Sequence, residues 1–341
     1  MTNHLKWGLI MIAAVWAALI GTMLGYAWNI MHMPQGAPRV QIPQMNNTNI
    51  SIETQEKMEG YWTVAVFGVD SREGTLGKGT RSDMQMILNV NLGTGEIRLV
   101  SVYRDTYLRI DDKERYDKIN EAYFKGGHKQ AIEALRENLD LSIDDYASFS
   151  WKAVADAINL LGGIDVDISH EEFRVINGFI TETVESTGVG SHHLKQEGPN
   201  HLDGVQAVAY ARLRKMDTDF KRTERQREVV DLALIKAREA DAATLSKVVA
   251  AVLPQISTSI GMKDMIPLMK NIKRFHLTDT EGFPSKLKDV MIGKRDCVVP
   301  VTLESNVKRL HQFLFDEENY EPSDTVKEIS RQIELRIKNK G

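Results

Sequence analysis

Seven cationic side chains are concentrated in one short stretch of the chain. Between residues 212 and 227, seven Lys or Arg stand against three acids, a local charge of +4 in a chain whose formal net charge is -4. The planar guanidinium group can donate two parallel hydrogen bonds to two oxygens of one phosphate. A cluster of arginines in a chain with a negative net charge therefore favours a phosphate ligand. The seven cations are Arg212, Arg214, Lys215, Lys221, Arg222, Arg225 and Arg227.

Helical spacing can bring several of these groups to one anion. If a helix begins at Arg222, then Arg225 and Gln226 lie three and four residues further on and share its face. Arg212 and Arg214, if extended, point the same way. The alternative is a solvated basic helix, stabilised by pairs of opposite charge three or four residues apart.

Acidic residues stand at the ends of predicted strands. Asp70 ends a buried strand and Asp83 begins the next one, so both can lie at the edge of the sheet where open α/β folds place their ligands. Carboxylates that face a phosphate need a cation between them, and a ligand set of few oxygens suits Mg²⁺. Arg104 and Asp105 repeat this arrangement after a third strand. On spacing alone, each acid could equally be an ordinary turn residue.

The elements that must position these groups follow from hydrophobic patterning. Residues 62–69 are nearly all apolar, which is typical of a strand buried on both faces. Residues 84–90 and 96–102 alternate around a Gly-containing turn and predict a hairpin. Asp203 and Gln206 have the spacing of a capping box at a helix start. Short strands are expected over 146–150 and 164–168, and helices over 129–139, 151–161, 207–211, 220–240, 243–253, 262–272, 303–315 and 323–338. This order predicts an α/β fold, a mixed central sheet covered by helices.

The N-terminal region predicts a membrane anchor. Residues 7–30 contain no charged side chain over a length sufficient to cross a bilayer. Lys6 precedes this segment and no Lys or Arg follows until Arg39, so the positive-inside rule places residues 1–6 in the cytoplasm and the rest outside. The alternative is a cleaved signal peptide, but the apolar run is longer than such peptides use, and no clear cleavage site follows.

The remaining organisation is simple. Residues 31–59 are rich in Pro, Asn, Gln and Thr and predict an extracytoplasmic linker, followed by one domain over 60–317 and a C-terminal helical tail over 318–341. The chain has a single cysteine, Cys297, so no internal disulfide can form. An exported domain without disulfides fits a bacterium that lacks a strongly oxidising compartment, of Gram-positive type.

Several blocks of this sequence, taken together and in order, closely resemble the LytR-CpsA-Psr family. They cover residues 62 to 230, and a membrane anchor ahead of them is the family's usual layout. The blocks are Gly68-Val69-Asp70-Ser71-Arg72, Arg81-Ser82-Asp83, Ser101-Val102-Tyr103-Arg104-Asp105-Thr106, Lys118-Ile119-Asn120-Glu121-Ala122-Tyr123, Leu161-Gly162-Gly163-Ile164-Asp165-Val166, Leu202-Asp203-Gly204, Tyr210-Ala211-Arg212-Leu213-Arg214 and Asp219-Phe220-Lys221-Arg222-Thr223-Glu224-Arg225-Gln226-Arg227.

The resemblance implies an α-β-α sandwich that transfers a phosphate-linked glycopolymer, such as wall teichoic acid or capsule, from an undecaprenyl-pyrophosphate carrier to peptidoglycan. It also implies an apolar tunnel between sheet and helices for the prenyl tail. The expected location is the cell membrane, as a single-pass type II protein with the catalytic domain outside.

Site residues follow from the same resemblance. It implies that Asp70 and Asp83 hold Mg²⁺, with Arg81 as a further member of the site. The general base is left open among Asp70, Asp83 and Asp105. The groups expected to bind the pyrophosphate are Arg104, Lys118, Arg212, Arg214, Arg222 and Gln226. The block Asn120-Glu121-Ala122 departs from relatives in which Asn is directly followed by Ala, and it leaves Lys118 in place.

Three other functions could use the same basic surface. Nucleic-acid binding conflicts with the predicted topology, because the arginines would lie outside the membrane. A non-catalytic sensor or regulator of envelope lipid would capture the carrier without transfer. A polyprenyl pyrophosphate hydrolase would use water as the acceptor in place of a glycan.

Overall fold

The computed structural model describes residues 47, 49–69, 76–214, 219–261 and 268–338. The segments predicted over 1–6 and 7–30 lie outside these ranges, as does Asp70. Within the described ranges, no helix is both long and apolar enough to cross a bilayer.

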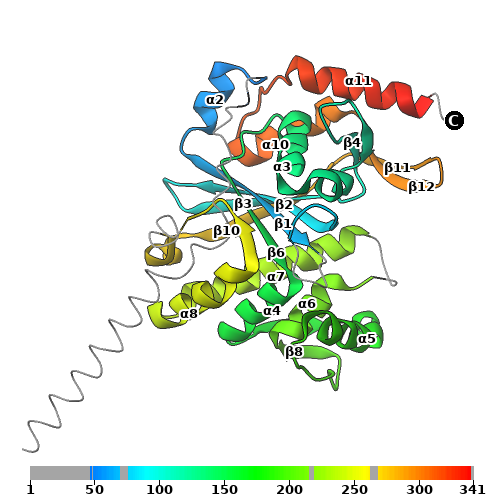
Figure 1. Cartoon of the computed structure of the whole chain (residues 1–341). Helices are drawn as coiled ribbons and strands as arrows, with labels where there is room; N and C mark the ends of the chain where they lie inside the picture. Colours follow the sequence, from blue (N-terminus) through cyan, green and yellow to red (C-terminus); the bar gives the residue numbers. More distant parts are fainter. Residues whose placement is uncertain (1–46, 48, 70–75, 215–218, 262–267, 339–341) are drawn as a thin grey trace, which may run out of the picture. The chain divides into compact units, whose positions relative to one another are not determined.

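A six-stranded sheet forms the centre of the fold (Figure 1), in the order β10-β3-β2-β1-β6-β9. Strand β1 is antiparallel to β2 and parallel to β6, while β3 is parallel to β10, so the mixed sheet is confirmed. The strands are β1 Tyr61–Val69, β2 Ser82–Asn91, β3 Glu96–Val102, β6 Asp145–Ser150, β9 Ile256–Thr258 and β10 His276–Phe283.

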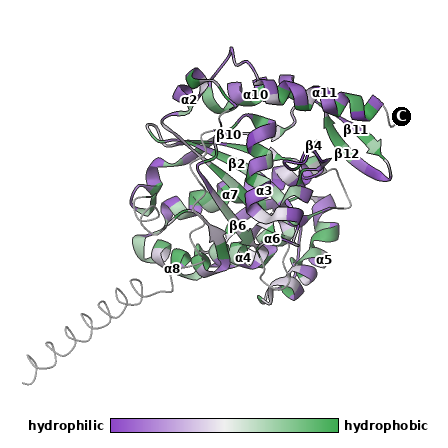
Figure 2. Cartoon of the chain, turned by 45° about the horizontal axis from the view of Figure 1, so that its top comes forward, coloured by the Kyte–Doolittle hydropathy of each residue, from purple (hydrophilic) through white to green (hydrophobic). Residues whose placement is uncertain are grey.

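Strand β1 is buried on both faces because each face packs against a separate apolar core. Ala65 and Phe67 contribute to one core, whereas Val64 and Val66 contribute to the other. This alternation is the two-residue period of a strand, with apolar side chains at every position from Val64 to Phe67. In Figure 2 the sheet is largely hydrophobic, and the helices around it carry both hydrophobic and hydrophilic residues.

The first core is covered by helices that lie far apart in the sequence (Figure 1). Val326, Ile329 and Ile333 of the last helix are buried in it, so only the outer side of the predicted C-terminal tail is solvated. A short helix also lies within the stretch predicted as a linker, and its Met58 is buried in the same core. These helices are α2 Ile52–Met58, α3 Asn120–Leu139, α10 Leu303–Phe315 and α11 Asp324–Lys338.

The second core is covered on the other face by α4 Trp151–Leu160, α5 His170–Thr187, α6 Gly204–Arg212 and α7 Asp219–Glu239. Helix α8 Ala242–Val252 packs against α4. The predicted capping box is confirmed, since the Asp203 side chain accepts from the Gln206 amide and the Gln206 side chain accepts from the Asp203 amide. Smaller elements are β4 Tyr107–Arg109, β5 Tyr116–Lys118, β7 Ile164–Ile168, β8 Gly198–Leu202, β11 Leu287–Ile292, β12 Arg295–Pro300 and the 3-10 turns η1 Leu253–Gln255 and η2 Ile272–Arg274.

Helix α6 is held by a close backbone contact with α4. A Cβ atom added at Gly204 would collide with the backbone of Ala155. We therefore expect Gly204→Ala to destabilise the protein by about 1 to 3 kcal/mol, because overpacking a buried contact forces backbone shifts. Gly178→Ala is the matched control, since its Cβ would meet no atom within 4 Å in helix α5. Urea unfolding followed by circular dichroism measures both, and equal stability of the two variants would contradict this packing.

Candidate functional site

Four charged residues form a chain of ion pairs at one edge of the sheet. Asp83 lies at the start of β2, Arg104 and Asp105 follow β3, and Lys118 ends β5. Arg104 Nη1 lies 2.7 Å from Asp83 Oδ1, and its Nε lies 3.8 Å from Asp105 Oδ1. Lys118 Nζ lies 3.1 Å from the same Asp105 oxygen. The structure thus brings together four of the predicted site residues, all only partly exposed.

Backbone hydrogen bonds fix the loop that carries Arg104. The Ile119 amide donates to the Thr106 carbonyl at 2.8 Å, and the Asn120 amide donates to the Arg104 carbonyl at 3.2 Å. The loop after β3 is therefore tied to the start of α3, which lies next to Lys118 in sequence. This explains how residues from distant parts of the chain keep a common position.

Arg81 lies beside the same helix. Its guanidinium pairs with Glu121 at 3.0 Å and lies 4.7 Å from the centroid of the Phe124 ring. Its side chain is 55% exposed. In the described part of the chain Arg81 therefore contacts α3, through the glutamate that departs from the family pattern, rather than the ion pairs of Asp83.

The arginine-rich half of the site is built by the end of α6 and the start of α7. Arg212 donates from Nη1 to Thr183 Oγ1 at 2.8 Å, and Arg214 is exposed. Arg222 is 2% and Gln226 3% exposed on α7. Gln226 Nε2 donates to the Ala211 carbonyl at 3.4 Å, whereas its buried Oε1 has no hydrogen-bond partner among the described residues. An acceptor left in this state is available to a bound group.

Arg225 has a different role from the one its spacing predicts. Its Nε lies 2.7 Å from Glu172 Oε1 of α5, and its Nη1 donates to the Leu213 carbonyl at 3.4 Å. The side chains of this pair are 7% and 11% exposed. Arg225 therefore ties α7 to α5 and to the segment between Arg212 and Arg214, and the prediction that it converges with Arg222 and Gln226 on an anion is not supported.

The two halves meet at an apolar cavity of about 250 Å³. Met84, next to Asp83, and Ala211, next to Arg212, both line it together with Gln226. The Tyr103 and Phe220 rings also link the halves, with centroids 4.7 Å apart. The other lining residues are Phe149, Trp151, Ala153, Val154, Ala157, Ile158, Val208, Val229, Val230, Ala233 and Val252. Gln226 is the polar side chain in this otherwise apolar lining, and Met84 and Ala211 are adjacent in sequence to the charged residues Asp83 and Arg212.

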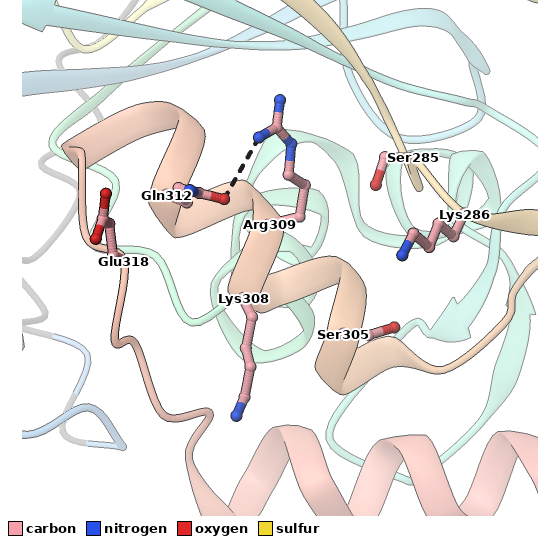
Figure 3. Close-up of a pocket in the computed structure, with 7 residues that line it drawn as sticks. All are labelled: Ser285, Lys286, Ser305, Lys308, Arg309, Gln312 and Glu318. Atoms are coloured by element: carbon pink, nitrogen blue, oxygen red, sulfur yellow. Dashed lines mark hydrogen bonds between the residues drawn. The ribbon is translucent and has the colours of Figure 1, made fainter.

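A second pocket, between α10 and the turn at Ser285 and Lys286, is a poor anion site (Figure 3). Lys308 Nζ already lies 2.7 Å from Glu321, and Arg309 Nε lies 3.2 Å from Glu281. Figure 3 shows these two cations extending to opposite sides of α10, so they do not converge.

The carboxylates of this site provide some of the ligands that a hard cation such as Mg²⁺ needs. Asp83 and Asp105 offer carboxylate oxygens, the ligands that Mg²⁺ prefers. Ser82, just before Asp83, is the register partner of Val69, the last described residue before Asp70. Asp70 itself lies outside the described residues, and the ranges that the structure covers contain no group of three or more His, Cys, Asp or Glu arranged to hold a metal.

A sequence comparison decides which family this architecture represents. A model of the LytR_cpsA_psr family matches residues 36–298. The chain belongs to the LytR-CpsA-Psr family.

Its relatives include named transferases. It is 32% identical to the polyisoprenyl-teichoic acid–peptidoglycan teichoic acid transferase TagU of Bacillus cereus (strain AH820). The aligned 231 residues cover 67% of this chain and 69% of the relative. It is 24% identical over 286 residues to TagV of Bacillus subtilis (strain 168), covering 82% of this chain and 71% of the relative.

Solved structures share the fold. "TagT bound to LIIa-WTA" aligns with a TM-score of 0.59 and 24% identity, over 76% of this chain and 92% of that one. The LytR-CPS2A-psr family protein YwtF (TagT) with bound octaprenyl pyrophosphate lipid aligns with a TM-score of 0.55 and 23% identity, over the same shares.

In this member of the family, two features of the site went unpredicted. Glu172 is one, although Ser169 and Glu172 have capping-box spacing that marks an ordered helix start, and both bonds of that box form. The cavity lining is the other. Trp151, at the start of α4, is buried and lines the cavity.

Proposed function

We propose that this protein is a phosphotransferase that moves a phosphate-linked glycopolymer from a polyprenyl pyrophosphate carrier to peptidoglycan. The observation that carries the proposal is an apolar cavity whose lining includes Gln226 and two residues, Met84 and Ala211, that are adjacent in sequence to Asp83 and Arg212. A molecule with a doubly charged head and a hydrocarbon tail matches this arrangement. The relatives named above are teichoic acid transferases, which favours wall teichoic acid as the polymer and undecaprenyl pyrophosphate as the carrier.

The head of the carrier is held by cations that the fold has already positioned. Arg222, buried beside Gln226, and half-buried Arg212 lose less side-chain entropy on binding than exposed cations would. Arg214 is exposed and supplies charge from the solvent side. Arg104 and Lys118 supply charge from the sheet edge. Such preorganised groups stabilise charge as it develops on a departing phosphate.

The reaction is a displacement at phosphorus. The 6-hydroxyl of N-acetylmuramic acid is the proposed acceptor, and its oxygen forms a bond to the phosphorus that carries the glycopolymer. The bond from that phosphorus to the bridging oxygen breaks, and polyprenyl monophosphate departs. The hydroxyl proton passes to a carboxylate, for which Asp70, Asp83 and Asp105 are the candidates.

Mg²⁺ is the proposed cofactor, held by Asp83 and Asp70. When bound, it would supply positive charge to phosphate oxygens. The competing role of Asp83 is purely to orient Arg104, with which it is already paired.

Substitution at Asp83 separates these roles. Asp83→Asn keeps an oxygen that can accept from Arg104 but removes the negative charge. We expect transfer to fall at least about 10-fold and to require a higher Mg²⁺ concentration, because a carboxylate ligand is replaced by a neutral one. Asp279→Asn, at an exposed position on β10, is the control. An unchanged Mg²⁺ requirement in Asp83→Asn would remove this residue from the metal site.

The tail site is tested by filling the cavity. Ala157 lines it from α4 and is only half-buried, so a larger side chain there should not prevent folding. We expect Ala157→Phe to raise the KM for a polyprenyl-linked donor about 10-fold or more, because the ring occupies space needed by the tail. Ala243→Phe, on the exposed side of α8, is the matched control. Equal KM values for both variants would place the tail elsewhere.

We further propose that residues 7–30 anchor the protein in the membrane, with the catalytic domain outside. The absence of charge over this segment and the cation at Lys6 support the proposal. Cysteine introduced at Ala243 should react with a membrane-impermeant maleimide in intact cells, whereas protection until lysis would reverse the topology.

A further inference from the structure

The cavity, which is partly open to solvent, encloses less volume than the full tail of the carrier occupies. A cavity of about 150 Å³ accommodates benzene, so the 250 Å³ found here holds roughly ten carbons, or about two isoprene units. An octaprenyl chain, of the kind bound by the similar YwtF (TagT), has eight such units. If the proposed function is correct, the rest of the tail needs further apolar surface, which displacement of one wall of the cavity would uncover.

We infer that α8 is this movable wall, and that it separates from α4 to cover a tail longer than the cavity holds in this structure. The inference rests on the proposed function, and it identifies the helix whose position determines how long a tail can enter. The helices that line the cavity differ in how much of their surface is buried.

Helices α6 and α4 bury more of their residues. Every residue of α6 from Gly204 to Ala211 is buried, and a Cβ at Gly204 would collide with α4. Helix α4 buries Trp151, Ala155 and Ile158. Displacing either helix would expose much of the second apolar core, which makes such a motion unfavourable.

Helix α8 is attached far more weakly. Of its eleven residues only Leu245 is fully buried, while Val248, Val249 and Val252 are half-buried, and Val252 lines the cavity. Figure 1 places α8 at the edge of its layer, beside α4. Segments with little buried apolar surface have the lowest free-energy cost of local opening.

The composition of this segment suits contact with a hydrocarbon chain. From residue 242 to residue 261 the only charged side chain is Lys247, which is exposed. If α8 moves away from α4, the valines that it uncovers can contact the tail, and no charge is drawn into an apolar space. These contacts with the tail replace the apolar contacts between α8 and α4 that are lost on opening.

A hinge and a latch lie at the two ends of α8. Only Ala240 and Asp241 separate it from α7, and Asp241 caps it by accepting from the Thr244 amide at 2.7 Å. After its other end, Gln255 Nε2 donates to Asp156 Oδ2 of α4 at 2.8 Å and to the Ala251 carbonyl at 2.9 Å. One hydrogen bond between partly exposed side chains is weak enough to break during ligand entry.

The test measures the distance between α8 and α4 as a function of tail length. In the full-length chain, with Cys297 replaced by Ser, spin labels are attached through Ala243→Cys on α8 and Leu160→Cys on α4, both exposed positions. Geranyl pyrophosphate, with two isoprene units, should leave the distance unchanged. Octaprenyl pyrophosphate should lengthen it by about 4 Å, the thickness of one layer of carbon atoms.

Binding is measured in parallel by calorimetry, so that the two proposals fail separately. If octaprenyl pyrophosphate binds and the distance stays the same, α8 is not the movable wall and the proposed function stands. If both lipids lengthen the distance equally, the motion is unrelated to tail length and the inference is wrong. If neither lipid binds, the proposed function fails and takes the inference with it.

Removal of the latch gives an independent kinetic test. Gln255→Leu should increase the association rate of octaprenyl pyrophosphate about threefold to tenfold, since one hydrogen bond no longer has to break, and should leave that of geranyl pyrophosphate unchanged. Lys247→Gln, on the exposed side of the same helix, is the control. Equal association rates for the two variants would contradict the latch.

Discussion

Arg212→Ala is expected to lower the rate of glycopolymer transfer roughly 30- to 1000-fold, equivalent to about 2 to 4 kcal/mol of transition-state stabilisation. The guanidinium lies at the end of α6, next to the cavity-lining Ala211, and is oriented by Thr183. Because the leaving phosphate gains charge as its bond breaks, the loss should appear mainly in kcat.

Two variants control for this result. Arg212→Lys keeps the charge but loses the planar fork, so its activity should lie between those of Arg212→Ala and the unmodified protein. Arg174→Ala removes an exposed arginine from α5 and should leave transfer unchanged. If Arg212→Ala transfers the polymer at the normal rate, the arginine cluster is not the anion site.

Arg225→Ala should have the largest effect on stability. It leaves Glu172, with a side chain only 11% exposed, without its ion-pair partner at 2.7 Å. Breaking a buried pair by removing one member costs about 3 to 5 kcal/mol, because the remaining charge stays buried. Urea unfolding should therefore show a large loss of stability, and transfer activity should fall in proportion to the fraction of folded protein.

A double variant separates this structural role from ligand binding. Glu172→Gln combined with Arg225→Met removes both charges while the Gln oxygen can still accept from Ser169, so most of the lost stability should return. A normal free energy of unfolding in Arg225→Ala, together with lost affinity for polyprenyl pyrophosphate, would instead place Arg225 in the anion site.

The fold could be predicted where periodicity was uninterrupted. Residues 164–168 and 303–315 were expected as a strand and a helix, and β7 and α10 have these bounds. Helix α3 begins nine residues before the predicted start at 129, because Gly126 and Gly127 interrupt the helical pattern and Gly127 adopts a φ of 68°. Strand β10 was missed, since an edge strand with many half-exposed polar residues lacks a clear apolar pattern.

The sequence motifs correctly identified several residues of the site. They could not show which of the charged residues contact one another. Asp83, Arg104, Asp105 and Lys118 do meet. Spacing alone could not show that Arg225 pairs with Glu172, because these residues lie 53 positions apart and the pairing depends on how α5 packs against α7. The cavity lining depended in the same way on six separate elements. The role of Asp70 remains a prediction from sequence.

Transferase activity is tested most directly by incubating the purified full-length protein with Mg²⁺, peptidoglycan and a polyprenyl-pyrophosphate-linked glycopolymer labelled in the glycan. We expect label to enter peptidoglycan and one polyprenyl monophosphate to be released for each polymer transferred. Stable binding of the donor without turnover would contradict this expectation and indicate a lipid sensor. Release of soluble labelled glycopolymer phosphate, equal with and without peptidoglycan, would contradict it in favour of a hydrolase.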